Sequence, residues 1–248
     1  MAKSVHGLGL VETVNHLICH LYPRIGGPWR ATVEALKKRL DMFDGRRIFG
    51  VVRGAGLEDW ELVRQELEGV ATDLIVNDND AGLREVVTMR PAIEIVERLP
   101  GSVFFCHSKG ATHHAESICQ EWREAMFEVC LNYPALISAA LEDKPICGPF
   151  RRFGGLGVEW HFSGSFFWFR AESVFMRHWR YVQDVWYGVE TFPACNFHAH
   201  ESRCLFMDRC GDLYDEKYWS TVVRPSLKFW RERMDKCTRL QTCASSHS

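Results

Sequence analysis

The sequence has no strong excess of charge of either sign. Its 248 residues include 30 basic and 32 acidic side chains, for a formal net charge of −2. Nonspecific binders of nucleic acid or membrane surfaces usually carry a marked basic excess, so neither class is indicated, although a local basic patch remains open. No apolar run approaches the length of about 20 residues that a membrane span needs. The longest aromatic stretch, 162–169, is interrupted by Ser163, Gly164 and Ser165.

The ten cysteines form no regular disulfide framework. A chain of this length buries enough core to fold without disulfides, so free thiols in a reducing cytoplasm are expected. Glu12, Asn15 and His16 interrupt any secretory apolar segment near the N-terminus. The ordinary composition, 46% hydrophobic and 25% charged, predicts a single domain over residues 1–240, followed by a flexible polar tail at 241–248.

Three glycine-based signatures are also missing. No G-x-G-x-x-G follows the first predicted strand, and no G-x-x-x-x-G-K-[ST] occurs anywhere. The segment Ser163-Gly164-Ser165 lacks the spacing of a G-x-S-x-G nucleophile elbow. The dinucleotide-binding fingerprint, the phosphate-binding loop of NTPases and the α/β-hydrolase nucleophile are therefore not indicated.

What the sequence does contain is an alternation of strand and helix patterns. Buried strands are predicted at 16–22, 47–52, 72–76 and 103–106, with amphipathic helices at 29–40, 57–67 and 83–99 between them. This order is typical of βαβ units and predicts an α/β fold with a mainly parallel sheet flanked by helices. Further along, a helical stretch over 116–141 is expected to break near Pro134, and 160–169 reads as one aromatic strand with a polar kink at its start.

The most informative segment is His107-Ser108-Lys109-Gly110, which directly follows a predicted strand. Open α/β sheets bind their ligands outside the carboxyl ends of the strands. A lysine offers a point charge for phosphate, and a glycine lets the backbone approach closely. This turn therefore predicts a site for an anion such as a nucleotide diphosphate. The alternative is a surface turn that happens to be basic.

Two other polar segments are candidates for metal binding. Asp78 and Asp80 lie in an Asn-Asp-Asn-Asp turn after a strand, and paired carboxylates can hold Mg²⁺ or Mn²⁺ against a diphosphate, although this is also a common turn composition. The other segment is dense in possible zinc ligands but matches no trusted spacing, so a substrate loop is the alternative. Its residues are Cys195, His198, His200 and Cys204.

Glu190 follows a glycine among apolar and aromatic neighbours. Such surroundings can raise the pKa of a carboxyl group and suit a general base. The alternative is a solvent-exposed glutamate at the start of a helix.

Taken together, these motifs resemble a group of small glycosyltransferase-like proteins with a GT-A-type nucleotide-sugar fold. That group carries an H-[ST]-K-G turn, an H-[FY]-S-G-N-[FW]-W-W strand and a downstream glutamate. The resemblance extends from His20 to about Phe206, and the chain departs from the pattern at Ser165 and Phe167, where the group has Asn and Trp. The matching segments are His107-Ser-Lys-Gly110, Trp122-Arg123 with Met126, Ile146-Cys-Gly148, His161-Phe-Ser-Gly-Ser-Phe-Phe-Trp168 and Glu190.

The resemblance implies transfer of a sugar from a nucleotide-diphosphate sugar to an acceptor hydroxyl. It places Lys109 and His107 at the leaving diphosphate and makes Glu190 the base that deprotonates the acceptor. The first strand's end would lie beside the nucleotide, and Asn77 and Asp78 would contact base or ribose. The full nucleotide-sugar-binding set that it implies is His20, Tyr22, Arg24, Asn77, Asp78, Ser108, Gly110, His161, Ser163, Gly164 and Ser165.

The resemblance leaves the metal and the acceptor open. In ordinary GT-A enzymes an Asp-x-Asp turn follows the strand that here ends at His107, so Lys109 would take the place of a divalent cation, while Mg²⁺ or Mn²⁺ at Asp78 and Asp80 remains a weaker expectation. The acceptor is a glycan, a small molecule or a hydroxymethylated DNA base, the last in a host cytoplasm if the chain is viral. A basic face for DNA would comprise Arg151, Arg152, Arg224, Lys228, Arg231 and Arg233.

Two alternatives belong to other functional classes. One is a nucleotide-sugar-binding module without catalysis. The other is a zinc-dependent hydrolase built on the cysteines and histidines of 195–204.

Overall fold

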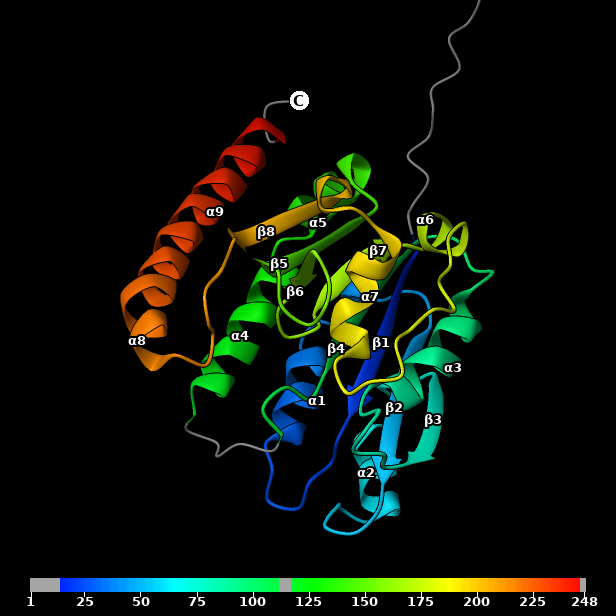
Figure 1. The fold of residues 1–248 in the computed structure, drawn as a ribbon. Coiled ribbons are helices and arrows are strands. Elements are labelled where there is room, and N and C mark those ends of the chain that lie inside the picture. The colour runs from blue at the N-terminus through cyan, green and yellow to red at the C-terminus, as the bar shows by residue number, and fades with distance from the viewer. Residues whose placement is uncertain (1–13, 112–116, 246–248) are drawn as a thin grey trace, which may run out of the picture.

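The computed structural model describes residues 14–111 and 117–245, which form an α/β fold around one mixed, mainly parallel sheet (Figure 1). Eight strands of the described residues run in the order β3-β2-β1-β4-β7-β5-β6, and β8 pairs with β5. The pairs among β1 to β4 are all parallel, as is β5 with β8, whereas β7 is antiparallel to both of its neighbours and β6 is antiparallel to β5.

The first four strands confirm the alternation expected from the sequence. Each predicted strand is present with its ends moved by at most two residues, and a helix lies between each consecutive pair. The strand bounds are β1 (Asn15–Leu21), β2 (Arg47–Arg53), β3 (Asp73–Asp78), β4 (Ser102–His107), β5 (Ile146–Phe153), β6 (Trp160–Phe162), β7 (Phe167–Arg170) and β8 (Ser202–Asp208).

Helices cover both faces of the sheet. The predicted break near Pro134 separates α4 from α5, and Pro134 begins the second helix, where a missing N–H costs nothing. The helix bounds are α1 (Trp29–Lys37), α2 (Trp60–Glu66), α3 (Val86–Val96), α4 (Ile118–Leu131), α5 (Pro134–Asp143), α6 (Ala171–Phe175), α7 (Gly188–Asn196), α8 (Glu216–Tyr218) and α9 (Arg224–Ser245).

Alternation along β1 assigns its side chains to two separate cores. Leu17, Cys19 and Leu21 belong to the core on one face of the sheet, which includes residues of α1, α2, α4, α5 and α9, whereas Ile18 belongs to the core on the other face, which includes residues of α3, α6 and α7. Successive side chains of a strand point to opposite faces. His20 therefore shares the α3 face with Ile18, and this puts its ring where α3 can reach it.

The aromatic segment 160–169 forms two strands, so the prediction of a single kinked strand is wrong. Trp160–Phe162 is β6, Phe167–Arg170 is β7, and the polar residues between them make a turn with positive φ at Gly164 (91°) and Ser165 (56°). The Ser165 N–H donates to the carbonyl of Phe162 at 3.1 Å and closes this turn. Both strands pair with β5, at opposite ends of that strand, and β7 also pairs with β4.

The C-terminal region adds β8 and α9, which the sequence patterns did not predict as separate elements. The indole of Trp230 on α9 donates to the carbonyl of Leu205 on β8 at 3.1 Å, and α9 lies at the outer edge of the molecule (Figure 1). The helical backbone continues to Ser245, into the expected tail, of which 246–248 lie outside the described residues. None of the helices in the described part has both the length and the apolar character for a membrane crossing.

Gly50 on β2 allows α3 to pack closely against the sheet. It is the register partner of His20, and a Cβ at this position would overlap the side chain of Thr88 on α3. The absence of a side chain at Gly50 is thus a packing requirement of the β2–α3 contact.

We expect Gly50→Ala to lower the free energy of unfolding by about 1–3 kcal/mol, the usual cost of overpacking a core. Gly82→Ala is the matched control, because Gly82 is exposed and a Cβ there meets only the Asp80 side chain, at 3.3 Å. Urea unfolding of both variants measures the difference. Equal midpoints for Gly50→Ala and the control would contradict this packing requirement.

Candidate active site

A cavity of about 290 Å³ lies at the carboxyl ends of β1 and β4. Eight of the residues predicted from the sequence line it, from four separate segments of the chain: His20, Tyr22, His107, Ser108, Lys109, Gly110, Ser165 and Glu190. The remaining lining residues are Asn79, Ala81, Arg84, Glu85, Ala111, Trp186, Tyr187 and Tyr214. The parallel register explains the meeting of the first two segments, because His20 pairs directly with His107 at the ends of their strands.

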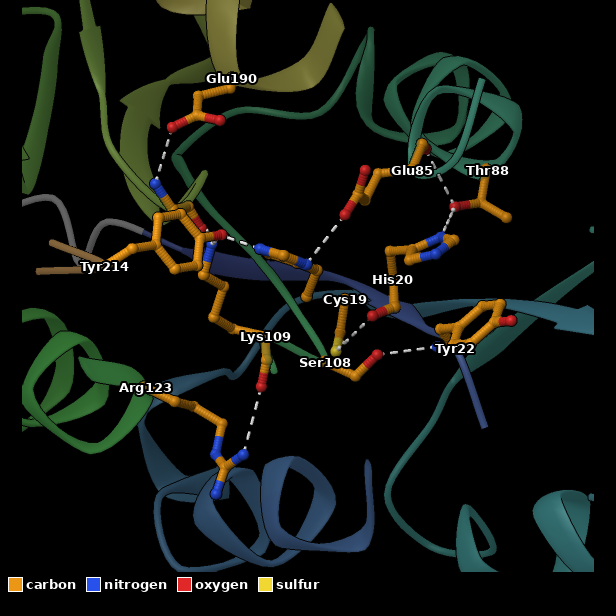
Figure 2. A network of polar contacts seen from close by, with 12 residues as sticks. Cys19, His20, Tyr22, Glu85, Thr88, Ser108, Lys109, Arg123, Glu190 and Tyr214 are labelled. Atoms are coloured by element: carbon orange, nitrogen blue, oxygen red, sulfur yellow. Dashed lines mark hydrogen bonds and ion pairs between the residues drawn. The ribbon is translucent and has the colours of Figure 1, made fainter. Parts of the chain in front are cut away.

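Ser108 ties the two strand ends together. Its N–H donates to the carbonyl of His20 at 2.9 Å, and its hydroxyl accepts the N–H of Tyr22 at 2.8 Å (Figure 2). The hydroxyl thus continues the β1–β4 ladder one step past the last regular pair. This fixes the backbone from which Lys109 and Gly110 extend.

Lys109 is held in an aromatic pocket. Its ammonium lies 3.9 Å above the centre of the Trp122 ring and donates to the Tyr214 hydroxyl at 3.0 Å. A cation over an aromatic face is attracted by the ring quadrupole. The buried Arg123 donates to the Lys109 carbonyl at 3.2 Å, so both backbone and side chain of Lys109 are positioned by α4 (Figure 2).

His107 is held between a carboxylate and a peptide carbonyl. Its Nδ1 lies 3.0 Å from the Glu85 carboxylate, and its Nε2 lies 2.9 Å from the carbonyl oxygen of Gly164. Burial raises the pKa of the Glu85 carboxyl, but the facing His107 ring, together with His20 and a backbone hydrogen bond, outweighs burial and lowers that pKa to about 2. Glu85 is therefore an anion at neutral pH.

The turn between β6 and β7 connects His107 to Glu190. The Gly164 N–H donates to the Glu190 carboxylate at 3.0 Å, while the Gly164 carbonyl faces His107 (Figure 2). His161 lies 3.8 Å from the same Glu190 oxygen. Burial lowers the pKa of His161, and Glu190 opposes this only in part, so we assign a neutral ring and no ion pair to this contact at neutral pH.

His20 forms the inner wall of the cavity. Its Nδ1 lies 2.7 Å from the Thr88 hydroxyl, and that hydroxyl is also 3.3 Å from the Glu85 carbonyl. Burial lowers the pKa of His20 to about 4, partly offset by Glu85 and reinforced by His107. His20 is thus neutral at physiological pH, beside a charged Glu85.

Asn77 makes a structural contact that the sequence pattern did not reveal. Pro91 inside α3 has no N–H to donate to the carbonyl of Val87, four residues earlier. The Asn77 side-chain amide donates to that carbonyl at 2.8 Å instead. The same bond explains why α3 continues through its proline rather than splitting, and it directs the Asn77 amide to α3 rather than to the cavity.

The other predicted binding residues lie outside the cavity wall. Arg24 is exposed and forms an isolated bridge with Leu57, while Asp78 pairs with Arg53 at 2.8 Å. His161, Ser163 and Gly164 stand behind the wall: the Ser163 hydroxyl lies 3.4 Å from His161, and Gly164 acts through its backbone. Of the eleven residues in the implied nucleotide-sugar set, five line the cavity and six do not; the five are His20, Tyr22, Ser108, Gly110 and Ser165.

The acidic turn after β3 does not fit a protein-held divalent cation. Asp78 is engaged by Arg53, and an Asp80 carboxylate oxygen accepts the N–H groups of Gly82 and Leu83 at 2.8 and 3.1 Å. Across 14–111 and 117–245, no group of three or more His, Cys, Asp or Glu side chains is placed to hold a metal ion.

The cysteines and histidines of 195–204 are likewise not placed to hold a zinc ion, within residues 14–111 and 117–245. His198 and His200 stack on each other with ring centres 5.6 Å apart. The Cys204 thiol donates to the Pro149 carbonyl at 3.5 Å, and burial raises the pKa of this thiol to about 11. Cys195, His198, His200 and Cys204 therefore do not form a zinc site within the described part of the chain.

Several cavity residues were not foreseen from the sequence. Glu85 immediately precedes α3, and Arg84, also unforeseen, has a positive φ of 48°, which is uncommon for a residue other than glycine. The Arg84 guanidinium stacks over Trp186 at 4.7 Å from the ring centre, and Trp186 is half exposed at the cavity rim. In the sequence, the one signal that could have indicated Trp186 and Tyr187 is that two adjacent aromatic residues directly precede Gly188.

No protein-family model matches the chain, and comparison with curated proteins finds no match. Solved structures resemble it loosely. A 4-diphosphocytidyl-2C-methyl-D-erythritol synthase is 12% identical with a TM-score of 0.41, over 87% of this chain and 100% of that one. HddC from Yersinia pseudotuberculosis is 11% identical with a TM-score of 0.42, over 86% and 99%. A synthase of the first type from Anaerococcus prevotii is 8% identical with a TM-score of 0.42, over 90% and 96%. These likenesses assign no activity to the chain.

The lowered pKa of His20 predicts loss of stability in mild acid. The folded value of about 4 lies below the ordinary 6.5, so the contribution is complete above pH 6.5 and is lost as the pH falls from 6.5 towards 4. The difference corresponds to about 3 kcal/mol. The carboxyl of Glu85 acts in the same direction in a lower window, from pH 4.5 towards 2.

Urea unfolding at several pH values between 4 and 7 measures this loss. We expect His20→Gln to flatten the dependence of the unfolding free energy on pH in that window. His178→Gln, a substitution on the exposed surface, serves as the control. An unchanged slope in His20→Gln would show that His20 is not the titrating group.

Proposed function

We propose that this protein transfers a sugar from a nucleotide-diphosphate sugar to an acceptor hydroxyl. The observation that carries the proposal is one cavity, at the carboxyl ends of two parallel strands, that presents the cation Lys109 and the carboxylate Glu190 together. Displacement at a sugar carbon needs these two opposite charges: a cation for the departing diphosphate and a base for the attacking hydroxyl.

The donor would bind along the turn that follows β4. The Lys109 ammonium and the Gly110 N–H would face the diphosphate, and Ser108 fixes the backbone between them and β1. The nucleoside would extend past Tyr22, which lines the cavity at the end of β1. A cavity of about 290 Å³ suits the diphosphate and sugar, with the nucleoside reaching beyond it.

The reaction would proceed as an inverting displacement. The acceptor oxygen attacks the anomeric carbon, and the bond from that carbon to the diphosphate oxygen breaks. Glu190 takes the proton of the acceptor hydroxyl, and the electron pair of the broken bond leaves with the diphosphate. Lys109 would stabilise the negative charge that accumulates there, an electrostatic effect that is often the largest single contribution to catalysis.

The acceptor would approach from the rim formed by Trp186 and Tyr187, which immediately precede the helix carrying Glu190. We favour a glycan or a small molecule over a DNA base. Three arginines of the basic face expected for DNA are already paired with carboxylates, and binding to duplex DNA depends on free positive charge at the phosphates. The pairs are Arg151 with Asp208, Arg224 with Glu121 and Arg231 with Glu128.

The alternative is a module that binds nucleotide sugars without catalysis. Incubation of the protein with UDP-, GDP-, CDP- and ADP-sugars separates the two functions, because only an enzyme releases the nucleoside diphosphate. A thermal-shift panel of the same compounds identifies the donor first, since a ligand that binds only the folded state raises the apparent stability.

Lys109→Ala is expected to lower turnover by on the order of a hundredfold or more, as removal of comparable transition-state donors does. Release of nucleoside diphosphate from the identified donor measures the loss. Lys228→Ala, a substitution of an exposed lysine on α9, is the control. Near-normal turnover in Lys109→Ala would exclude its role at the leaving group.

Glu190→Gln is expected to abolish most transfer, by roughly 10²- to 10⁴-fold, because an amide cannot accept the acceptor's proton. The amide oxygen can still accept the Gly164 N–H, so donor binding should remain near that of the wild type. Glu172→Gln on the exposed surface of α6 is the matched control. Retained transfer in Glu190→Gln would rule out Glu190 as the base.

A further inference from the structure

Two carboxylates face opposite ends of a single chain of hydrogen bonds that runs through the β6–β7 turn. Glu85 contacts His107 Nδ1 at 3.0 Å, and His107 Nε2 contacts the Gly164 carbonyl at 2.9 Å. The N–H of the same Gly164 donates to Glu190 at 3.0 Å. In Figure 2, Glu85 and Glu190 lie at the two ends of this chain.

The two ring nitrogens of His107 have partners of the same kind. Both of its ring nitrogens face hydrogen-bond acceptors, a carboxylate on one side and a peptide carbonyl on the other. A neutral imidazole has one N–H, so both bonds form only when the ring carries two. The other groups against the ring are His20 from β1, which is neutral, and the Phe166 ring at 5.8 Å, so Glu85 is the anion that faces this ring.

The backbone of the β6–β7 turn has little conformational freedom at Gly164, the residue that contacts Glu190. Gly164 has a φ of 91°, and a Cβ there would lie 2.7 Å from the Met126 sulfur and 3.1 Å from Trp122. The residue is therefore confined against α4, and its two peptide groups are the contacts that face the cavity residues. A rotation of the Gly164 carbonyl away from His107 would also turn the backbone next to the N–H that binds Glu190.

We propose that Glu85 is a positioning residue: it holds His107 as an imidazolium, and through the Gly164 peptide groups this ring fixes the carboxylate of Glu190 in the cavity. The structural part of this inference stands on the contacts alone. Its consequence for catalysis rests on the proposed function, in which Glu190 is the base.

The network is tested without any ligand. Amide hydrogen exchange of Gly164 and the ¹⁵N signals of the His107 ring are measured by NMR at pH 7 in the wild type, Glu85→Ala and Glu85→Gln. We expect two protonated ring nitrogens in the wild type and one in either variant. Gly164 exchange should be roughly five- to tenfold faster in Glu85→Ala, as expected for loss of one hydrogen bond. It should return towards the wild-type rate in Glu85→Gln, whose amide can donate to Nδ1.

Glu201→Gln is the matched control, because Glu201 is a similarly buried carboxylate that pairs with Arg177 away from the cavity. It should change neither signal. A single ring proton on His107 in the wild type, or unchanged Gly164 exchange in Glu85→Ala, would overturn the proposal. Should Glu85→Ala fail to fold, two ring protons retained in Glu85→Gln would overturn it equally.

The effect of Glu85 on catalysis is measured separately, with the donor identified by the thermal-shift panel. Glu85→Ala should lower kcat on the order of a hundredfold, the cost of a misplaced catalytic group, and leave the KM for the donor near its wild-type value. If Glu85 had a purely structural role, Glu85→Ala would change both kcat and KM or neither of them. Glu85→Gln would then show no recovery of kcat. If Glu190→Gln retains transfer while the NMR results hold, the proposed base is wrong and the network remains.

Discussion

The pairing of His20 with His107 at the ends of two parallel strands is the constraint on which the site depends. Alternation along each strand places both rings on the face that α3 covers, where Thr88 meets one ring and Glu85 meets the other. Burial keeps the His20 ring neutral, whereas the His107 ring faces the Glu85 carboxylate at 3.0 Å. The absence of a side chain at Gly50 on β2 lets α3 come this close to the sheet.

The charges of the cavity are arranged so that each is held before any ligand arrives. The ammonium of Lys109 rests between Trp122 and Tyr214, and Glu190 is fixed by the Gly164 N–H. Preorganised charges of this kind need little reorganisation during a reaction, which is why they contribute strongly to catalysis. In the proposed reaction Lys109 supplies the positive charge at the diphosphate, and the acidic turn after β3, which is engaged by Arg53 and by backbone N–H groups, has no part.

Much of the fold could be predicted from the sequence, because strands buried on both faces are continuous apolar runs and their alternation with helices has few solutions. The turn after β4 could be found for a similar reason, since it directly follows such a run. Glu85 could not, because its importance comes from a histidine 22 residues later in the chain. The contact of Asn77 with α3 could not be predicted either, because nothing local reveals that Pro91 leaves a carbonyl for this side chain. The split of 160–169 into two strands depends on the turn at Gly164 and Ser165, and the close packing of Gly164 against α4 is also nonlocal.

The central claim is that the cavity beside Lys109 binds the diphosphate of a nucleotide sugar by the protein's own charges. Calorimetric titration of UDP, GDP, CDP and ADP into the wild type and Lys109→Ala, both in EDTA, tests it most directly. The account predicts that at least one nucleoside diphosphate binds the wild type in chelator and binds Lys109→Ala at least about tenfold more weakly, a difference of roughly 1.4 kcal/mol. Binding that occurs only after Mn²⁺ or Mg²⁺ is added, or that is equal in the two proteins, would contradict it.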